Sequence, residues 1–196
     1  MAETVHAPLV MTTSTDLEAR LLSYSALSKP RVGARELADR VRVVELYRLL
    51  NDSQNLCIAL SQLSIAAALN QKLDLAHQTL DEGVGLLQPS WPIPLRLSPL
   101  IAKHFYLRAS DGDSQEAWDV ASEMLQLAMQ SGETYSICWA QSFLARTELH
   151  IGRVRDAVAR SREVVALARR ARYANTELPN ALSLLSHCLT KLGELD

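Results

Sequence analysis

One spacing constrains the fold of this chain more than any other feature: a turn residue followed five positions later by alanine recurs about every 40 residues. The pairs are Gly33 with Ala38, Asn70-Gln71 with Ala76, Gly112 with Ala117, and Gly152 with Ala157, and Gly193 is a further turn residue of this kind. The alanines are 38, 41 and 40 residues apart. A fixed period of this size is typical of stacked helical repeats.

The pair has a physical explanation in an antiparallel helical hairpin. Glycine just past a helix end can adopt the left-handed conformation that closes the last turn. The chain then reverses, and an alanine in the first turns of the second helix allows the two backbones to approach closely. We therefore predict an all-α fold, a right-handed superhelix of antiparallel helical hairpins with about four and a half repeats.

Composition and periodicity agree with this prediction. Hydrophobic residues make up 48% of the 196 residues and aromatics only 5%, while the abundant leucine, alanine and arginine are good helix formers. Apolar residues recur at helical spacing between the turns. The predicted helices span 14–28, 34–50, 54–69, 73–88, 98–110, 114–130, 134–151, 154–172 and 177–192. We expect a disordered tail over 1–13, one repeat domain over 14–196, and a proline-rich linker over 88–99.

Charge and cysteine usage exclude several classes of protein. The net charge of −2 gives no overall attraction to nucleic acid or to an anionic membrane. The first residues lack the basic and apolar regions of a secretory signal, and no stretch reaches the roughly 18 apolar residues of a membrane span. The three cysteines are widely spaced, which suggests neither a disulfide framework nor a zinc site. We predict a cytoplasmic protein with no membrane partner.

Catalytic motifs are missing from the sequence. The five histidines form neither H-x-x-x-H nor H-E-x-x-H, and no serine stands in G-x-S-x-G. Cys57 and Cys138 each precede the turn position of their repeat by 14 residues, and this shared register favours buried packing over a reactive thiol. We predict that the protein is not an enzyme and that it uses no cofactor and no metal.

Segment 59–89 resembles a tetratricopeptide repeat. Its small residues, turn, helix-internal alanine and closing proline are Ala67 and Ala68, Asn70-Gln71, Ala76 and Pro89. The turn lacks the glycine of that family, and the period is near 40 residues rather than about 34. The resemblance implies a solenoid in which first helices line a concave groove.

Residues 37–196 are also similar to the repeat region of large bacterial ATPase transcriptional regulators, most clearly over 44–71 and 151–170. In that family the region follows a nucleotide-switching ATPase. The phosphate-binding string G-x-x-x-x-G-K-[ST] does not occur in this sequence, and a winged helix is absent too. The resemblance therefore implies only the sensing or docking arm of such a regulator, without ATP hydrolysis or DNA binding.

Charge is distributed unevenly in the second half of the sequence. Residues 111–133 contain six acidic residues and no lysine or arginine, whereas 146–172 contain eight arginines and three acidic residues. One interpretation is that both are solvated outer faces. The other is that the arginine-rich helix 153–172 binds an acidic partner through Arg155, Arg162 and Arg169, because arginine suits carboxylate and phosphate recognition. Nucleic acid is disfavoured because few aromatic residues lie nearby to stack on bases.

Three aromatic residues are further candidates. Tyr106 and Trp139 stand on first helices of their predicted hairpins, so we expect them to line the concave groove and contact a partner, with core packing as the alternative. Trp91 either fills the join between two hairpins or forms a partner contact.

The predicted helix 177–192 carries Leu182, Leu185, Leu189 and Leu192, and no second helix follows it in this sequence. An uncapped apolar stripe predicts one of two things: the sequence is a fragment of a longer protein, or this helix docks on a partner or on a second copy, with Leu185 and Leu189 as contacts.

Three functions remain open from the sequence. The first is a non-catalytic scaffold that binds a peptide or protein in the groove, within a system like that of the transcriptional regulators. The second is a sensing arm for a small-molecule inducer, for which Gln62, Lys103 and Gln141 are polar candidates. The third is nucleic-acid binding through helix 153–172.

Overall fold

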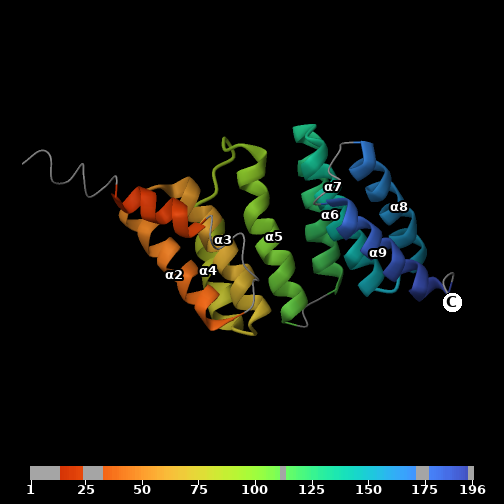
Figure 1. Cartoon of the computed structure of the whole chain (residues 1–196), viewed down its shortest axis with the longest axis horizontal. Helices are drawn as coiled ribbons and strands as arrows, with labels where there is room; N and C mark the ends of the chain where they lie inside the picture. Colours follow the sequence, from red (N-terminus) through yellow and green to blue (C-terminus); the bar gives the residue numbers. More distant parts are fainter. Residues whose placement is uncertain (1–13, 24–32, 111–113, 171–176, 194–196) are drawn as a thin grey trace, which may run out of the picture. The chain divides into compact units, whose positions relative to one another are not determined.

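The computed structural model describes residues 14–23, 33–110, 114–170 and 177–193, and all regular structure in these ranges is helical (Figure 1). The helices are 14–23, α2 (Ala34–Leu49), α3 (Ser53–Leu69), α4 (Leu73–Gly85), α5 (Ile93–Ala109), α6 (Ser114–Ser131), α7 (Thr134–His150), α8 (Val154–Arg170) and α9 (Glu177–Leu192). The all-α prediction is confirmed. The predicted tail 1–13, the turn residue Gly112 and the predicted helix ends at 24–28 and 171–172 lie outside the described residues.

The chain divides into two compact units, Met1–Ser110 and Asp111–Asp196. We call them unit 1 and unit 2. The sequence predicted one repeat domain over 14–196, and its continuity across both units remains a prediction.

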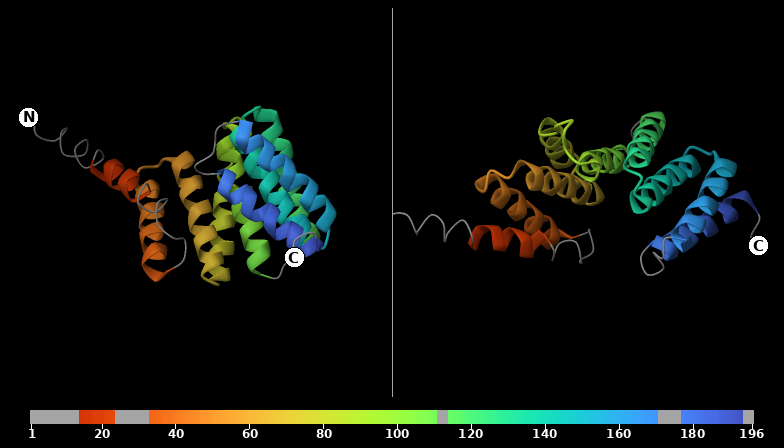
Figure 2. Two further views of the ribbon diagram at one scale, coloured as in Figure 1. Left: turned by 45° about the vertical axis from the view of Figure 1, so that its right-hand side comes forward. Right: turned by 90° about the horizontal axis from the view of Figure 1, so that it is seen from above.

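In unit 1, α3 is the central helix, because it packs on α2, on α4 and on α5. These helices lie side by side (Figure 2). The sequence of α3 suits this position, since it consists mostly of alanine, leucine, serine and isoleucine, and ten of its residues are buried. Its buried serines satisfy their hydroxyls on the backbone: Ser61 donates to the carbonyl of Cys57, and Ser64 donates to that of Ala76 at 2.8 Å.

In unit 2, α7 has the corresponding place and packs on α6, α8 and α9. Two apolar clusters join α7, α8 and α9. One contains Cys138, Val164, Val165, Ala168 and Ala181. The other contains Ala145, Ala157, Val158, Leu184 and Cys188. In both units, therefore, a helix packs on the next helix and also on the next but one.

Several of the described turns contain one residue with left-handed backbone, whereas the connection between α4 and α5 contains none. These residues are Asn51 (φ 52°), Gln71 (57°), Gly132 (67°), Gly152 (81°) and Gly193 (79°). After Gln71 the N–H of Lys72 donates to the carbonyl of Ala67 at 2.8 Å, and after Gly152 the N–H of Arg153 donates to that of Glu148 at 2.8 Å. These bonds close the helix ends as a Schellman motif does. The predicted role of Gln71 in place of glycine is thus confirmed.

Replacing Gln71 by glycine is expected to stabilise the protein by about 0.5–1 kcal/mol, because a side chain with a Cβ is disfavoured in left-handed backbone and glycine is not. Urea unfolding followed by circular dichroism measures the change. Glycine at Gln78, an exposed position inside α4, is the control and is expected to cost about 1 kcal/mol. Equal losses at both positions would contradict the assignment of the turn.

The alanine of the repeat behaves as predicted in three cases and differently in one. Ala76, Ala117 and Ala157 are buried, whereas Ala38 is exposed. The buried alanines are each the fourth residue of their helix, but α2 begins directly after Gly33, so its fourth residue is Leu37. Leu37 packs half-buried against the cluster of Ala67, Ala68 and Ala76. The prediction for Ala38 was wrong because the earlier helix start rotates that position away from the core.

The proline-rich linker was also predicted wrongly in part. The helix α5 begins at Ile93 rather than at 98, because Pro94 lies in the first helical turn, where no backbone N–H is needed. Pro99 is buried inside the helix. Trp91 is 7% exposed, so it fills the join before α5 and offers little surface to a partner.

Candidate partner-binding surfaces

The predicted arginine contacts lie on one face of α8. Arg155, Ala159, Arg162, Ala166 and Arg169 are all exposed and alternate at spacings of four and three residues, so they share one stripe of the helix. We call this set the α8 stripe. A helix rises about 1.5 Å per residue, which places successive stripe arginines roughly 10 Å apart along the axis. The residues between successive stripe arginines on this face are the small Ala159 and Ala166, which are exposed as well.

Two other arginines of this region have structural roles. Arg160 donates from Nε and Nη2 to both carboxylate oxygens of Glu148 at 2.8–3.1 Å, and this hydrogen bonding raises the pKa of Arg160. The guanidinium of Arg153 lies over the ring of Trp118, 5.1 Å from its centroid. The arginine-rich helix thus joins the unit through one set of arginines and presents another outward.

The acidic segment of unit 2 faces solvent as well. Segment 111–133 contains six acidic residues. Four of them, Glu116, Asp119, Glu123 and Glu133, are described by the structure, and all four are exposed. Asp111 and Asp113 lie outside the described residues. On α8 itself Asp156 and Glu163 are exposed beside the stripe.

Tyr106 and Trp139, the two aromatic residues predicted to line a groove, each contact another aromatic ring within their own unit. The ring of Tyr106 stands edge-on to His77 of α4 with centroids 5.3 Å apart, and it packs against the alanine cluster of α3 and α4. Trp139 stands edge-on to Phe143 one turn later on α7, at 5.0 Å. Both are half-buried, so core packing accounts for much of each ring, and their contact with a partner remains a prediction.

The leucines of α9 are largely covered by unit 2. Leu185 and Leu189 are half-buried against the clusters that join α7, α8 and α9. Leu182 is the exposed member, at 42%. Self-association through Leu185 and Leu189 therefore remains a prediction, and the structure leaves less apolar surface on this helix than the sequence suggested.

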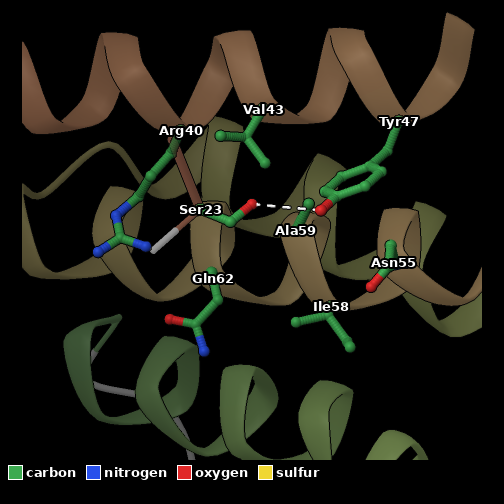
Figure 3. A pocket seen from close by; sticks show the side chains of 8 residues that line it. All are labelled: Ser23, Arg40, Val43, Tyr47, Asn55, Ile58, Ala59 and Gln62. Atoms are coloured by element: carbon green, nitrogen blue, oxygen red, sulfur yellow. Dashed lines mark hydrogen bonds between the residues drawn. The ribbon is translucent and has the colours of Figure 1, made fainter. Parts of the chain in front are cut away.

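Unit 1 contains a cavity of about 220 Å³ between α2, α3 and helix 14–23 (Figure 3). Its lining residues are Ser23, Arg40, Val43, Tyr47, Asn55, Ile58, Ala59 and Gln62. Arg40 and Gln62 lie at one end, Tyr47 and Asn55 at the other. The tyrosine hydroxyl and Ser23 are 3.5 Å apart, and Ser23 also donates to the carbonyl of Ala19.

Sequence reasoning missed this cavity. The sequence predicted Gln62 as a polar candidate for binding a small-molecule inducer, but it gave no location for such a pocket and did not single out Arg40. No local motif marks the site, because its walls come from three separate helices.

Cys57 and Cys138 are buried, as their register predicted, and Cys188 is buried as well. The thiol of Cys57 faces the carbonyl of Gly83 at 3.4 Å, and that of Cys138 faces the carbonyl of Val164 at 3.9 Å. Burial raises the pKa of both thiols to about 11, so the reactive thiolate is disfavoured. No cluster of metal-binding side chains occurs among the described residues, and none of the helices described there is long and apolar enough to cross a membrane.

Consecutive antiparallel hairpins, with first helices packed on one another, define a tetratricopeptide-like helical repeat. Tetratricopeptide-like repeats of a protein described as a kinesin light chain of Podospora anserina have a similar crystal structure, with a TM-score of 0.64 over 94% of this chain and 89% of that chain. The sequences are 18% identical, so the likeness shows the fold. No family model and no curated protein matches the sequence.

Proposed function

We propose that this protein is a non-catalytic interaction module that binds an acidic protein segment along the α8 stripe. The observation that carries the proposal is the row of exposed Arg155, Arg162 and Arg169 at seven-residue spacing, with alanines between them. A guanidinium can donate two parallel hydrogen bonds to one carboxylate. A helix with acidic residues every seventh position would match all three arginines.

The fold and the remaining candidates support this choice. Repeat arrays of this class commonly bind proteins through extended surfaces. Tyr106 and Trp139, which the sequence assigned to a groove, are half-buried, whereas Arg155, Arg162 and Arg169 are exposed. From the resemblance of 37–196 to bacterial ATPase regulators, we further propose that the module serves as a docking arm in a regulator-like system.

The test uses a fluorescein-labelled helical peptide with glutamate at every seventh position, titrated with the full chain and followed by anisotropy. Changing Arg155, Arg162 and Arg169 together to glutamate is expected to weaken binding at least about a hundredfold, since each charge-assisted contact contributes about 1 kcal/mol or more. Changing the same arginines to lysine is expected to weaken it less, because the charge remains and the planar fork is lost.

The matched control is glutamate at three exposed cations of unit 1, Arg35, Lys72 and Arg108, which alters net charge equally and should leave binding unchanged. Equal weakening in both triple variants would contradict a specific site on α8. A labelled DNA duplex is titrated in parallel. Tighter binding of the duplex, with a steep dependence on salt, would favour the nucleic-acid alternative over the proposal.

A further inference from the structure

We propose that the α8 stripe of one copy binds the acidic side of α6 in a second copy, so that the protein assembles head to tail. The acidic side of α6 consists of the exposed residues Glu116, Asp119 and Glu123. This partner is one for the same stripe, so its assignment rests on the proposed function. The two still fail separately, because a stripe that binds acidic peptides need not bind α6.

The two helices carry opposite charge. The helix α6 contains three acidic residues and no lysine or arginine, whereas α8 contains five arginines and two acidic residues. The three acidic residues of α6 follow one another at spacings of three and four, so they share one side of the helix. Contacts of α6 with α6, or of α8 with α8, would bring like charges together, which is unfavourable. A contact between copies therefore pairs α6 with α8.

The spacing of the polar residues on the two helices also agrees. Glu116, Glu123 and Gln130 are exposed on α6 at intervals of seven residues, the interval of the stripe arginines on α8. Each row extends about 21 Å along its helix, at roughly 1.5 Å per residue. Glu123 is the middle residue of its row, so it meets Arg162 whether the two helices run parallel or antiparallel. The side-chain carbonyl of Gln130 can accept a hydrogen bond from a further arginine.

The orientation of the two helices keeps these rows apart within one copy. Trp118 of α6 borders one pocket together with Asp156 and Glu163 of α8, so these residues lie where the two helices face each other. At about 100° per residue, the stripe arginines lie roughly 110° further round α8, and the acidic side lies roughly 130° round α6 from Trp118. Each row is thus turned away from the other helix of its own copy, and the rows can meet only between copies.

The resulting interface uses two different surfaces. The stripe lies toward α9, since Arg155 borders a pocket with Leu192 of that helix, whereas the acidic side of α6 is turned away from α8. A second copy bound through its α6 would therefore stand to α8 as α8 stands to its own α6. An interface of this kind joins copies into a chain or a ring and does not close at a dimer.

The experiment measures the mass of the full chain by sedimentation velocity, from micromolar to nearly millimolar concentration, at low and at high salt. We expect the average mass at low salt to rise with concentration beyond that of a dimer. At high salt we expect it to fall toward one chain, because salt screens exposed charges.

Two triple variants locate the interface. One changes Glu116, Asp119 and Glu123 to lysine, and the other changes Arg155, Arg162 and Arg169 to glutamate. Each variant alone is expected to associate at least about tenfold more weakly, because like charges then face each other. An equal mixture of the two is expected to associate again, since each reversed row then meets a row of opposite charge.

The matched control is lysine at three exposed acidic residues of unit 1, Glu18, Glu45 and Asp81, which changes net charge equally and should leave association unchanged. A single-chain mass of the unchanged protein at every concentration would overturn the assembly. Association that survives either triple variant, or that the mixture fails to restore, would overturn it as well. The lysine variant of α6 keeps the stripe, so it should bind the labelled acidic peptide like the unchanged protein. Absence of peptide binding in both would contradict the proposed function instead.

Discussion

Replacing Glu148 by glutamine is expected to destabilise the protein by about 2–4 kcal/mol. The Glu148 side chain is 3% exposed and accepts three hydrogen bonds from Arg160, which is itself 24% exposed. Glutamine keeps the size of the side chain but loses the charge and one acceptor oxygen. Arg160 would then remain partly buried without its counter-charge, which costs more than the loss of an exposed ion pair.

Urea unfolding of the full chain, followed by circular dichroism, measures this effect. The control is Glu163→Gln on α8, because Glu163 is exposed and its loss should change stability by no more than about 0.5 kcal/mol. A double-mutant cycle with Arg160→Met measures the interaction free energy between Glu148 and Arg160, apart from the other contributions of each residue. A loss below that of the control would show that the pair contributes nothing to the packing of α8 on α7.

Replacing Ala157 by leucine is expected to cost about 3 kcal/mol, because the added atoms have no space in a filled core. Ala157 is fully buried in the cluster that contains Ala145 of α7 and Leu184 and Cys188 of α9. A larger side chain would force α8 away from both neighbouring helices. The measurement is again the free energy of unfolding in urea.

Ala159 supplies a control on the same helix, two residues further on and exposed in the α8 stripe. Leucine there is expected to change stability by about 0.5 kcal/mol or less. Similar losses at both positions would contradict the close approach of backbones that the repeat spacing implies. An unchanged free energy of unfolding in Ala157→Leu would also contradict this close approach, whatever the result at Ala159.

The repeat spacing predicted most of the fold because it reflects two strong local requirements. A left-handed turn residue and a small residue in the next helix are both visible in the sequence, and Gly152 with Ala157 shows both. The same rule misassigned Ala38, because α2 starts one residue after its turn residue Gly33, whereas α4 and α8 start two residues after Gln71 and Gly152, so Leu37 takes the position of the buried alanine. It also missed the early start of α5, since proline in a first turn resembles proline in a linker.

The candidate sites were predictable only where they follow helical periodicity. The stripe arginines were found because seven-residue spacing puts them on one face whatever the neighbouring helices do. The exposure of Leu185 and Leu189 depended on the packing of α9, which periodicity alone does not fix. The cavity beside Arg40 is lined by residues of three helices. Its presence therefore depends on how these helices pack, and no pattern within one segment predicts it.

The left-handed turn residues Asn51 and Gln71 are twenty positions apart, as are Gly132 and Gly152. One helix with its turn is therefore the smallest step by which such an array can lengthen. Within each unit the odd-numbered helices pack on one another, α3 on α5 in unit 1 and α7 on α9 in unit 2, with an even-numbered helix between them in the chain. Within a unit, gain or loss of one step would put every following helix in the place of its neighbour, so only changes by an even number of steps keep the same helices packed on one another.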